Sequence, residues 1–371
     1  MILRSDFDSP TKSMIVTTRM SSKSSTVIVR PSSKVIFSIS MAIISFLCII
    51  PILAMASNAS GVGVPIKLGV KVWAPDFFSY LAQDKGFFEK NNVSVELKLV
   101  QDYQQILNNY AEGEFDGMIP VYSDLIYRNE QGMDSRVVYA IDFSNTGDVI
   151  IGKGNNTTLA DEKGKMISVE GINSFSHLFV LEALNKVGLT EGDVEIASVP
   201  VENVTQELDK GTIAAGHIYQ PYTSEALKKG YKILFAAGNI PGAITDVLVF
   251  RSKVIQERPQ DVRAVIKSII EAQKYYRFNQ EESLKIMSNR SGIDIHAIKN
   301  GLDSVVLPSL KDNFVNAMND KSTEATSLYS SGRYIFEFFL DRGQLDQYPD
   351  FNRLVDPEFV KSLNQDTINE R

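Results

Sequence analysis

The sequence predicts an α/β fold made of two similar units, and three observations support this. From residue 66 to about residue 250, short β-like segments alternate with amphipathic helical segments, which is typical of parallel sheets with helical crossovers. A weak internal repeat divides this region in two. From about residue 253 onward the chain is expected to be nearly all helix. Hydrophobic residues make up 44% of the 371 residues, so the chain can bury a sizeable core.

The N-terminal 56 residues are predicted to direct export. Residues 1–34 carry more basic than acidic side chains, and residues 35–56 form an uncharged apolar run. About 20 apolar residues are enough to cross a bilayer. A basic leader before such a run indicates a secretory signal peptide or a signal-anchor, whereas a buried core helix would need a partner helix before it. We therefore expect an extracytoplasmic protein at the cell surface or in the periplasm, either exported or anchored by residues 35–56.

The first part of the α/β region alternates strands with helices. Residues 93–100 alternate apolar and polar side chains, which is the period of a half-buried strand. The helix over 103–112 ends at Gly113, and the helix over 77–88 stops near Gly86, since glycine favours helix ends. The same criteria predict strands at 66–72, 115–121 and 136–142, and a helix at 122–131.

The pattern then repeats. Residues 174–187 form an amphipathic helix that ends at Gly188, and residues 244–250 are one more strand. Residues 328–340, in the helical C-terminal part, carry a strong apolar face that predicts core packing, or alternatively docking on a membrane partner. The remaining elements are strands at 148–153, 165–169, 193–199, 213–219 and 231–236, and helices at 201–210 and 222–229.

Two segments resemble each other across the two parts. In each, a helix ends in glycine, a strand follows, and an aromatic residue with polar neighbours stands at the carboxyl end of the strand. The segments are 113–117 with Tyr122-Ser123-Asp124, and 211–215 with Tyr219-Gln220-Pro221. Open α/β sheets bind ligands at the carboxyl ends of their strands, so two facing lobes would form one cleft. The alternative is coincidence in a chain punctuated by glycines.

Composition and motifs exclude several functions. The net charge of −7, from 38 basic and 45 acidic side chains, argues against nucleic acid as a partner. A single cysteine, Cys48, excludes a disulfide framework and a cysteine-ligated zinc site. The three histidines lack metal-ligand spacing, and no nucleophile elbow, metalloprotease helix or phosphate loop is present. We therefore expect no cofactor, no metal and no catalytic residue.

A series of short motifs covers roughly residues 65–280 in a specific order. The motifs are Val72-Trp73-Ala74-Pro75, 80–88, 93–97, 113–117, 159–165, Tyr219-Gln220-Pro221-Tyr222, 245–249 and Arg258-Pro259. The series resembles the extracytoplasmic solute-binding proteins of ABC importers, in the branch that handles nitrate, taurine, alkanesulfonates and thiamine pyrimidines. The resemblance implies the two-lobed type II periplasmic-binding-protein fold, here with a helical C-terminal extension, and a ligand between the lobes.

The resemblance also implies a domain plan. We expect lobe 1 at 61–147 and 252–371, lobe 2 at 148–251, and crossing segments near 146–153 and 244–252. It implies a small-molecule solute, a membrane permease, a separate ATPase subunit and a monomeric protein. Residues 280–371 show little that matches the family. The pyrimidine-synthesising relatives carry a cysteine-rich signature that this chain lacks, which disfavours an enzyme of that kind; a ligand-sensing receptor ectodomain is the other alternative.

The expected ligand site combines a helix start with aromatic and acidic side chains. Asn173, Ser174 and Ser176 open the helix at 174–187, whose N–H groups could bind an anion, or they form an ordinary cap. Aromatic and acidic groups at strand ends suit an amine or a heteroaromatic ring, so together the features suggest a zwitterion such as an aminosulfonate. For any one aspartate, a cap or a solvated turn is the alternative. The full candidate set is Trp73, Asp76, Tyr122, Ser123, Asp124, Asn173, Ser174, Ser176, His177, Tyr219, Gln220, Tyr222 and Asp246.

Overall fold

The computed structural model describes residues 63–154 and 158–369. The leader expected at 1–56 lies outside the described residues. Within them, no helix is long and apolar enough to cross a membrane.

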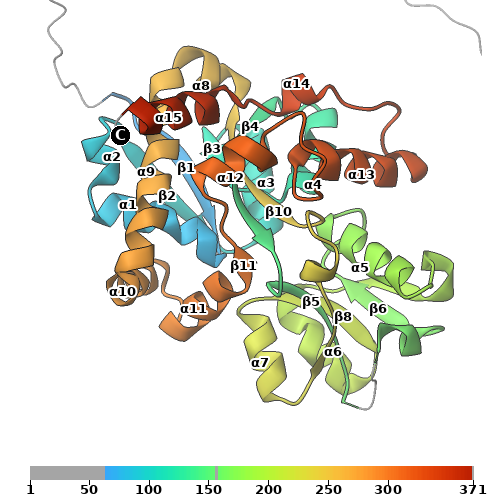
Figure 1. Cartoon of the computed structure of the whole chain (residues 1–371). Helices are drawn as coiled ribbons and strands as arrows, with labels where there is room; N and C mark the ends of the chain where they lie inside the picture. Colours follow the sequence, from blue (N-terminus) through green and yellow to red (C-terminus); the bar gives the residue numbers. More distant parts are fainter. Residues whose placement is uncertain (1–62, 155–157, 370–371) are drawn as a thin grey trace, which may run out of the picture. The chain divides into compact units, whose positions relative to one another are not determined.

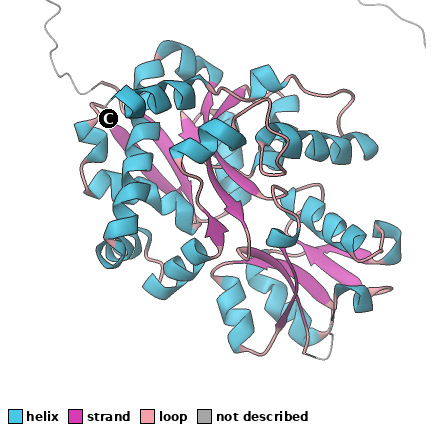
Figure 2. Ribbon diagram, in the orientation of Figure 1, coloured by secondary structure: helices cyan, strands magenta, loops and turns pink. Residues whose placement is uncertain are grey.

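The first sheet holds six strands, and we call it and its helices lobe 1 (Figures 1 and 2). Its order is β2-β1-β3-β10-β4-β11, in which β1 pairs in parallel with β2 and β3, and β10 runs antiparallel to both β3 and β4. The strands are β1 (Ile66–Lys71), β2 (Val95–Val100), β3 (Gly117–Met118), β4 (Ser135–Ser144), β10 (Thr245–Arg251) and β11 (Val305–Val306).

The second sheet holds five strands, and we call it and its helices lobe 2 (green and yellow in Figure 1). Its order is β7-β6-β8-β5-β9, in which β6 pairs in parallel with β7 and β8, and β5 runs antiparallel to β8 and β9. The strands are β5 (Asp148–Gly152), β6 (Met166–Val169), β7 (Glu195–Ser198), β8 (Ala215–Tyr219) and β9 (Lys232–Ala236).

The two sheets share one strand order. In each, the strand that arrives from the other lobe, β10 in lobe 1 and β5 in lobe 2, runs antiparallel beside the third strand of the parallel set. β3 and β8 are therefore equivalent strands. They follow α3 (Tyr103–Glu112) and α6 (Val204–Lys210), which end at Gly113 and Gly211 in the left-handed conformation. The prediction of two similar α/β lobes is confirmed, and the repeat has a structural basis.

β10 belongs to the sheet of lobe 1, where it fills the gap between β3 and β4, whereas a lobe 2 that extends to residue 251 would include this strand. The apolar pattern that predicts a strand does not indicate which sheet the strand joins. The chain crosses between the sheets at 145–147 and again at 237–244.

The helices between residues 78 and 228 cover both sheets. In lobe 1 they are α1 (Phe78–Asp84), α2 (Phe87–Lys90), α3 and α4 (Tyr122–Glu130); in lobe 2 they are α5 (Phe175–Lys186), α6 and α7 (Tyr222–Lys228). α3 packs on β1 and β2, and α5 packs on β6.

The C-terminal third packs on lobe 1. α9 lies against α1 and α2, α10 against α1 and α11, α13 against α4, and α15 against β4. The expectation that this part is nearly all helix is confirmed; the short strand β11 and a π-helical turn at Asn313–Ala317 are its other elements. The helices are α8 (Ser252–Glu257), α9 (Pro259–Phe278), α10 (Gln280–Ser291), α11 (Ile295–Asp303), α12 (Leu310–Asp312), α13 (Leu328–Asp341), α14 (Phe351–Leu354) and α15 (Glu358–Asn369).

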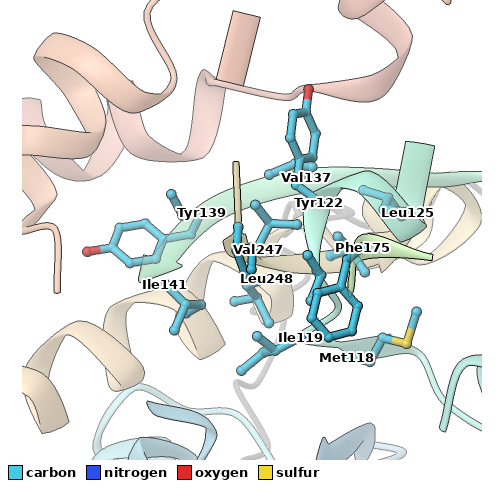
Figure 3. Packing of buried hydrophobic residues seen from close by; sticks show 14 of the residues in the cluster. Met118, Ile119, Tyr122, Leu125, Val137, Tyr139, Ile141, Phe175, Val247 and Leu248 are labelled. Atoms are coloured by element: carbon cyan, nitrogen blue, oxygen red, sulfur yellow. The ribbon is translucent and has the colours of Figure 1, made fainter. Parts of the chain in front are cut away.

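The largest hydrophobic cluster sits on the sheet of lobe 1 and reaches into lobe 2. Figure 3 shows Met118, Val247 and Leu248 from central strands and Ile119, which follows β3, together with Phe175, the first residue of α5. Each such side chain contributes about 1.5–3 kcal/mol when it is fully buried. Because Phe175 belongs to lobe 2, the core itself extends across the junction of the two sheets.

Candidate ligand-binding site between the lobes

A cavity of about 80 Å³ lies where the carboxyl ends of β1, β3 and β8 meet the starts of β5 and β10. This is the edge at which open α/β sheets bind ligands. Both lobes supply its walls. The lining residues are Lys71, Val72, Trp73, Gln101, Tyr103, Val121, Ile244 and Asp246 from the lobe 1 side, and Asp148, Phe175, Tyr219 and Tyr222 from lobe 2.

The lobes touch on two sides of this cavity. On one side, Asn300 Nδ2 of α11 donates to Ser224 Oγ of α7 at 3.1 Å. On the other, Arg342 at the end of α13 donates to Asn173 Oδ1 at 3.2 Å and pairs with Glu191 Oε2 at 2.5 Å. The lobes are therefore in direct contact at both places in this structure.

Aromatic rings form much of the wall. Trp73 meets Tyr219 edge to face across the lobes, with ring centroids 6.1 Å apart. Tyr219 meets Tyr222 at 6.2 Å, and Tyr103 meets Phe175 at 5.7 Å, again across the lobes. Such walls pack against flat or apolar ligand bodies and place ring faces where a cation can bind.

A buried ion cluster forms the floor on the lobe 1 side. The Lys71 ammonium lies 3.1 Å from Asp76 Oδ1, 3.1 Å from Asp246 Oδ2 and 2.9 Å from the Ile119 carbonyl oxygen. Asp142 faces Asp246 across β4 and β10 and accepts the indole N–H of Trp73 at 3.2 Å. The cluster thus contains three carboxyl groups and one ammonium group, which contacts two of them.

The excess of acid raises the pKa values of this cluster. Burial raises the pKa of Asp76 to about 7, although the charge of Lys71 acts to lower it. Burial and the neighbouring Asp246 raise the pKa of Asp142 well above its ordinary value, and burial raises that of Asp246. Burial alone would lower the pKa of Lys71, but the three carboxylates outweigh it and raise that pKa. The lysine therefore stays charged, whereas Asp76, with its pKa at about 7, can hold a proton near neutral pH.

Lobe 2 supplies further acids. Asp148 begins β5 and its Oδ1 lies 3.0 Å from His217 Nε2, with both side chains buried. Glu170 follows β6 and accepts the hydroxyl of Tyr219 at 3.1 Å. Burial raises the pKa of Glu170 to about 7. Among the described residues, no three histidine, cysteine, aspartate or glutamate side chains are arranged to hold a metal ion.

The N–H and hydroxyl groups at the start of α5 are hydrogen-bonded to other groups of the protein. The Phe175 N–H donates to Asp124 Oδ1 at 2.9 Å, and Asp124 comes from α4 in lobe 1. The Ser174 hydroxyl donates to the Gly171 carbonyl at 2.7 Å, and Ser176 Oγ accepts the backbone N–H of Glu170 at 3.0 Å. The expectation of free N–H groups facing the cleft is therefore wrong at Phe175, because a carboxylate of the other lobe fills the anion position.

Asn173 and His177 lie beside the Arg342 contact and do not line the cavity. The Asn173 N–H donates to His177 Nδ1 at 3.0 Å, and His177 Nε2 lies 3.4 Å from Glu191. Burial and the charge of Arg342 lower the pKa of His177, so the ring is neutral around pH 7. These residues join the lobes rather than bordering the cavity.

The structure brings some of the other candidates to the cavity and leaves others away from it. Trp73, Tyr219, Tyr222 and Asp246 line it, while Asp76 and Asp124 contact lining residues. Tyr122 points into the core and donates to the Leu328 carbonyl at 3.1 Å. The remaining two candidates also lie outside the lining: Ser123, which is buried in α4, and Gln220, which accepts from Ser224.

Sequence reasoning omitted several residues of the site. Lys71 is the most informative omission, since a lysine at the carboxyl end of β1 stands at the ligand edge of a sheet. Asp148 carries a similar signal as the first residue of a strand that enters from the other lobe. The omitted residues are Lys71, Gln101, Tyr103, Asp142, Asp148, Glu170 and Phe175.

The bond between Asp124 and Phe175 gives a testable stability effect. Replacing Asp124 with alanine leaves a buried backbone N–H without an acceptor, so we expect Asp124→Ala to lower the free energy of unfolding by about 1–3 kcal/mol. Asp124→Asn keeps an oxygen at the same place and should retain most of the stability. Urea denaturation of both variants measures this. Equal losses in the two variants would contradict a role through the hydrogen bond.

Comparison with known proteins places the chain in a family. Residues 76–283 match the family model described as "NMT1/THI5 like". The chain is 26% identical over 211 residues to the taurine-binding periplasmic protein of Escherichia coli K12, an alignment that covers 56% of this chain and 65% of that protein. The match therefore spans slightly less than two thirds of that relative.

Solved structures share the fold. The periplasmic aliphatic sulphonate binding protein SsuA of Escherichia coli superposes with a TM-score of 0.65 at 18% identity, covering 79% of this chain and 92% of that one. The desulfurization enzyme DSZB superposes with a TM-score of 0.61 at 14% identity, covering 81% and 99%. At these identities the likeness concerns the fold alone. The matched family model spans more than half of the sequence, and the chain belongs to the NMT1/THI5-like family with the periplasmic-binding-protein fold.

Proposed function

We propose that this protein is the extracytoplasmic solute-binding component of an ABC importer. The observation that carries the proposal is the cavity at the facing edges of the two sheets, to which each lobe contributes rings and carboxyl groups. A ligand held between two lobes stabilises their closed arrangement, and closure is a signal that a membrane permease can recognise. The permease and a separate ATPase subunit are the partners in this proposal.

The proposal includes export and a monomeric state. Residues 35–56 act as a cleaved signal or as an anchor, and the binding domain works outside the cytoplasm. The taurine-binding relative is a periplasmic protein by name, which supports this location. We propose the chain acts as a single copy, because its cavity takes every wall from one chain.

We propose binding rather than catalysis, although the same fold carries the enzyme DSZB. Nucleophilic catalysis needs a serine, threonine or cysteine within hydrogen-bond reach of its base. Within the described residues, His217 bonds to Asp148, His177 accepts the Asn173 N–H and lies 3.4 Å from Glu191, and no hydroxyl or thiol bonds to either ring. Residues arranged this way support a binding site better than a catalytic one.

Transport gives the decisive test. Deletion of the gene should abolish uptake of one class of small polar solute, and the wild-type gene should restore it. A version with Trp73→Ala should restore less uptake, because this ring forms part of the wall from lobe 1. Retention of uptake for every solute tested would contradict the importer role and favour a receptor ectodomain, which would show ligand binding without transport.

A further inference from the structure

The cavity has far more buried acid than base. Five aspartates around it are at most 5% exposed, and Glu170 is partly buried beside them. They come from both lobes. Lys71 is the one buried lysine or arginine among the side chains that the structure describes. The five aspartates are Asp76, Asp124, Asp142, Asp148 and Asp246.

Lys71 has no donor left for an anionic ligand. An ammonium group carries three N–H donors. Here they face Asp76 Oδ1, Asp246 Oδ2 and the Ile119 carbonyl oxygen, each within 3.1 Å. A sulfonate or carboxylate would have to displace one of these buried acceptors, which would then lose its partner.

The other strong donors at the cavity are also engaged. The N–H at the start of α5 is held by Asp124, the indole N–H of Trp73 by Asp142, and the hydroxyl of Tyr219 by Glu170. Among the lining residues with polar side chains, Gln101 and Tyr222 form no side-chain hydrogen bond to another described residue. Both side chains are neutral. An anion would therefore meet no free cationic donor at the cavity, only neutral ones, beside several buried carboxyl groups.

Two buried carboxyl oxygens near the cavity, in contrast, have no N–H or hydroxyl donor. Asp246 is 3% exposed and lines the cavity, and its Oδ1 receives no hydrogen bond from such a donor, although the Asp142 carboxyl lies beside it. Glu170 Oε2 is likewise buried without a donor. A buried acceptor without a donor carries a desolvation cost of about 1–3 kcal/mol, which a ligand N–H group would remove.

The rings complete the recognition of a cation. Trp73, Tyr219 and Tyr222 stand next to these carboxylates, so a ligand of matching size meets both an acid and the face of a ring. Rings alone would suit a quaternary ammonium, but the unpartnered acceptors favour a group that carries N–H.

We propose that the cavity binds a small protonated amine with an apolar or aromatic body, and that it excludes sulfonates and other anions. The inference rests on the proposed function and adds its solute class. It departs from the aminosulfonate suggested by the sequence, because the helix start that was to hold the sulfonate is occupied by Asp124.

Three probes with one ring separate the possibilities. Benzylamine carries a positive charge and N–H donors, benzyltrimethylammonium has the charge without N–H, and phenylmethanesulfonate has the opposite charge. Thermal denaturation and calorimetry of the purified protein, with each probe up to the millimolar range, measure binding. We expect benzylamine to bind at least about tenfold more tightly than benzyltrimethylammonium, a difference of about 1.4 kcal/mol, and no binding of phenylmethanesulfonate. Taurine joins the series as the zwitterion.

A pair of variants links binding to the acid. Asp246→Asn should lower the affinity for benzylamine at least about tenfold. Asp350→Asn is the matched control, since Asp350 is exposed and caps α14 through the Asn352 N–H, which asparagine also accepts. Should Asp246→Asn fail to fold, the comparison of probes on the wild type still decides.

The outcomes separate this inference from the importer role. Binding of phenylmethanesulfonate or taurine at least as tightly as benzylamine overturns the amine class and leaves the importer role intact. No binding of benzylamine also overturns it. Binding of benzylamine in a protein whose deletion changes no amine uptake contradicts the importer role and keeps the amine site.

Discussion

Replacing Lys71 with methionine is expected to destabilise the protein strongly and in a pH-dependent way. Removal of one partner of a buried ion cluster leaves uncompensated charge and costs about 3–5 kcal/mol. Asp76, Asp142 and Asp246 would then share no buried cation. We expect this loss in the free energy of unfolding at pH 8 and a smaller loss at pH 5, because burial raises the pKa of Asp76 to about 7 and this carboxyl is protonated in the folded state at pH 5. Urea denaturation at the two pH values measures both.

Lys67→Met is the matched control. Lys67 lies in the same strand, four residues earlier, with an exposed side chain. Surface changes of this kind usually alter stability by less than about 0.5 kcal/mol. A Lys71→Met protein as stable as this control, or a loss that does not shrink at low pH, would show that the ion cluster is not what holds this edge of lobe 1.

Glu170→Gln is expected to stabilise the protein, but only at higher pH. Burial raises the pKa of Glu170 from 4.5 to about 7. Between these values the folded state keeps a proton that the unfolded state has lost, so this group's contribution to stability is present below pH 4.5 and falls as the pH rises to about 7. Glutamine never bears the buried charge and keeps an oxygen for the Tyr219 hydroxyl. We expect a gain of about 2–3 kcal/mol at pH 8.5 and little difference at pH 4.5.

Glu170→Gln should also weaken the binding of an amine. A carboxylate that destabilises its own fold and stands beside a cavity is typical of a functional group, because removing it gains stability and loses function. Glu195→Gln, at an exposed position of β7 in lobe 2, should change neither property. Denaturation curves from pH 4.5 to 8.5 for the wild type and both variants give the answer. A constant difference across this range would contradict the assigned protonation.

Local patterns in the sequence determine the elements of this fold. The alternation over 93–100 and the glycines at 113 and 211 mark strand and helix ends through preferences that act within a few residues. Two similar α/β lobes follow from the repeat of those patterns. The same patterns place Trp73, Tyr219 and Asp246 at strand ends, which is why these three reach the cavity.

Contacts between distant residues decided the rest. Lys67 and Lys71 stand four residues apart in the same strand, β1, yet only Lys71 is buried. The reason is that Asp76 and Asp246 both contact the ammonium group of Lys71. The anion site expected at α5 was lost to Asp124, about fifty residues earlier in the chain. The sequence by itself determined the strands, the helices and the edge that forms a site. Only the tertiary structure decided which sheet received β10 and which charges were paired, because pairing and desolvation depend on neighbours that local periodicity does not encode.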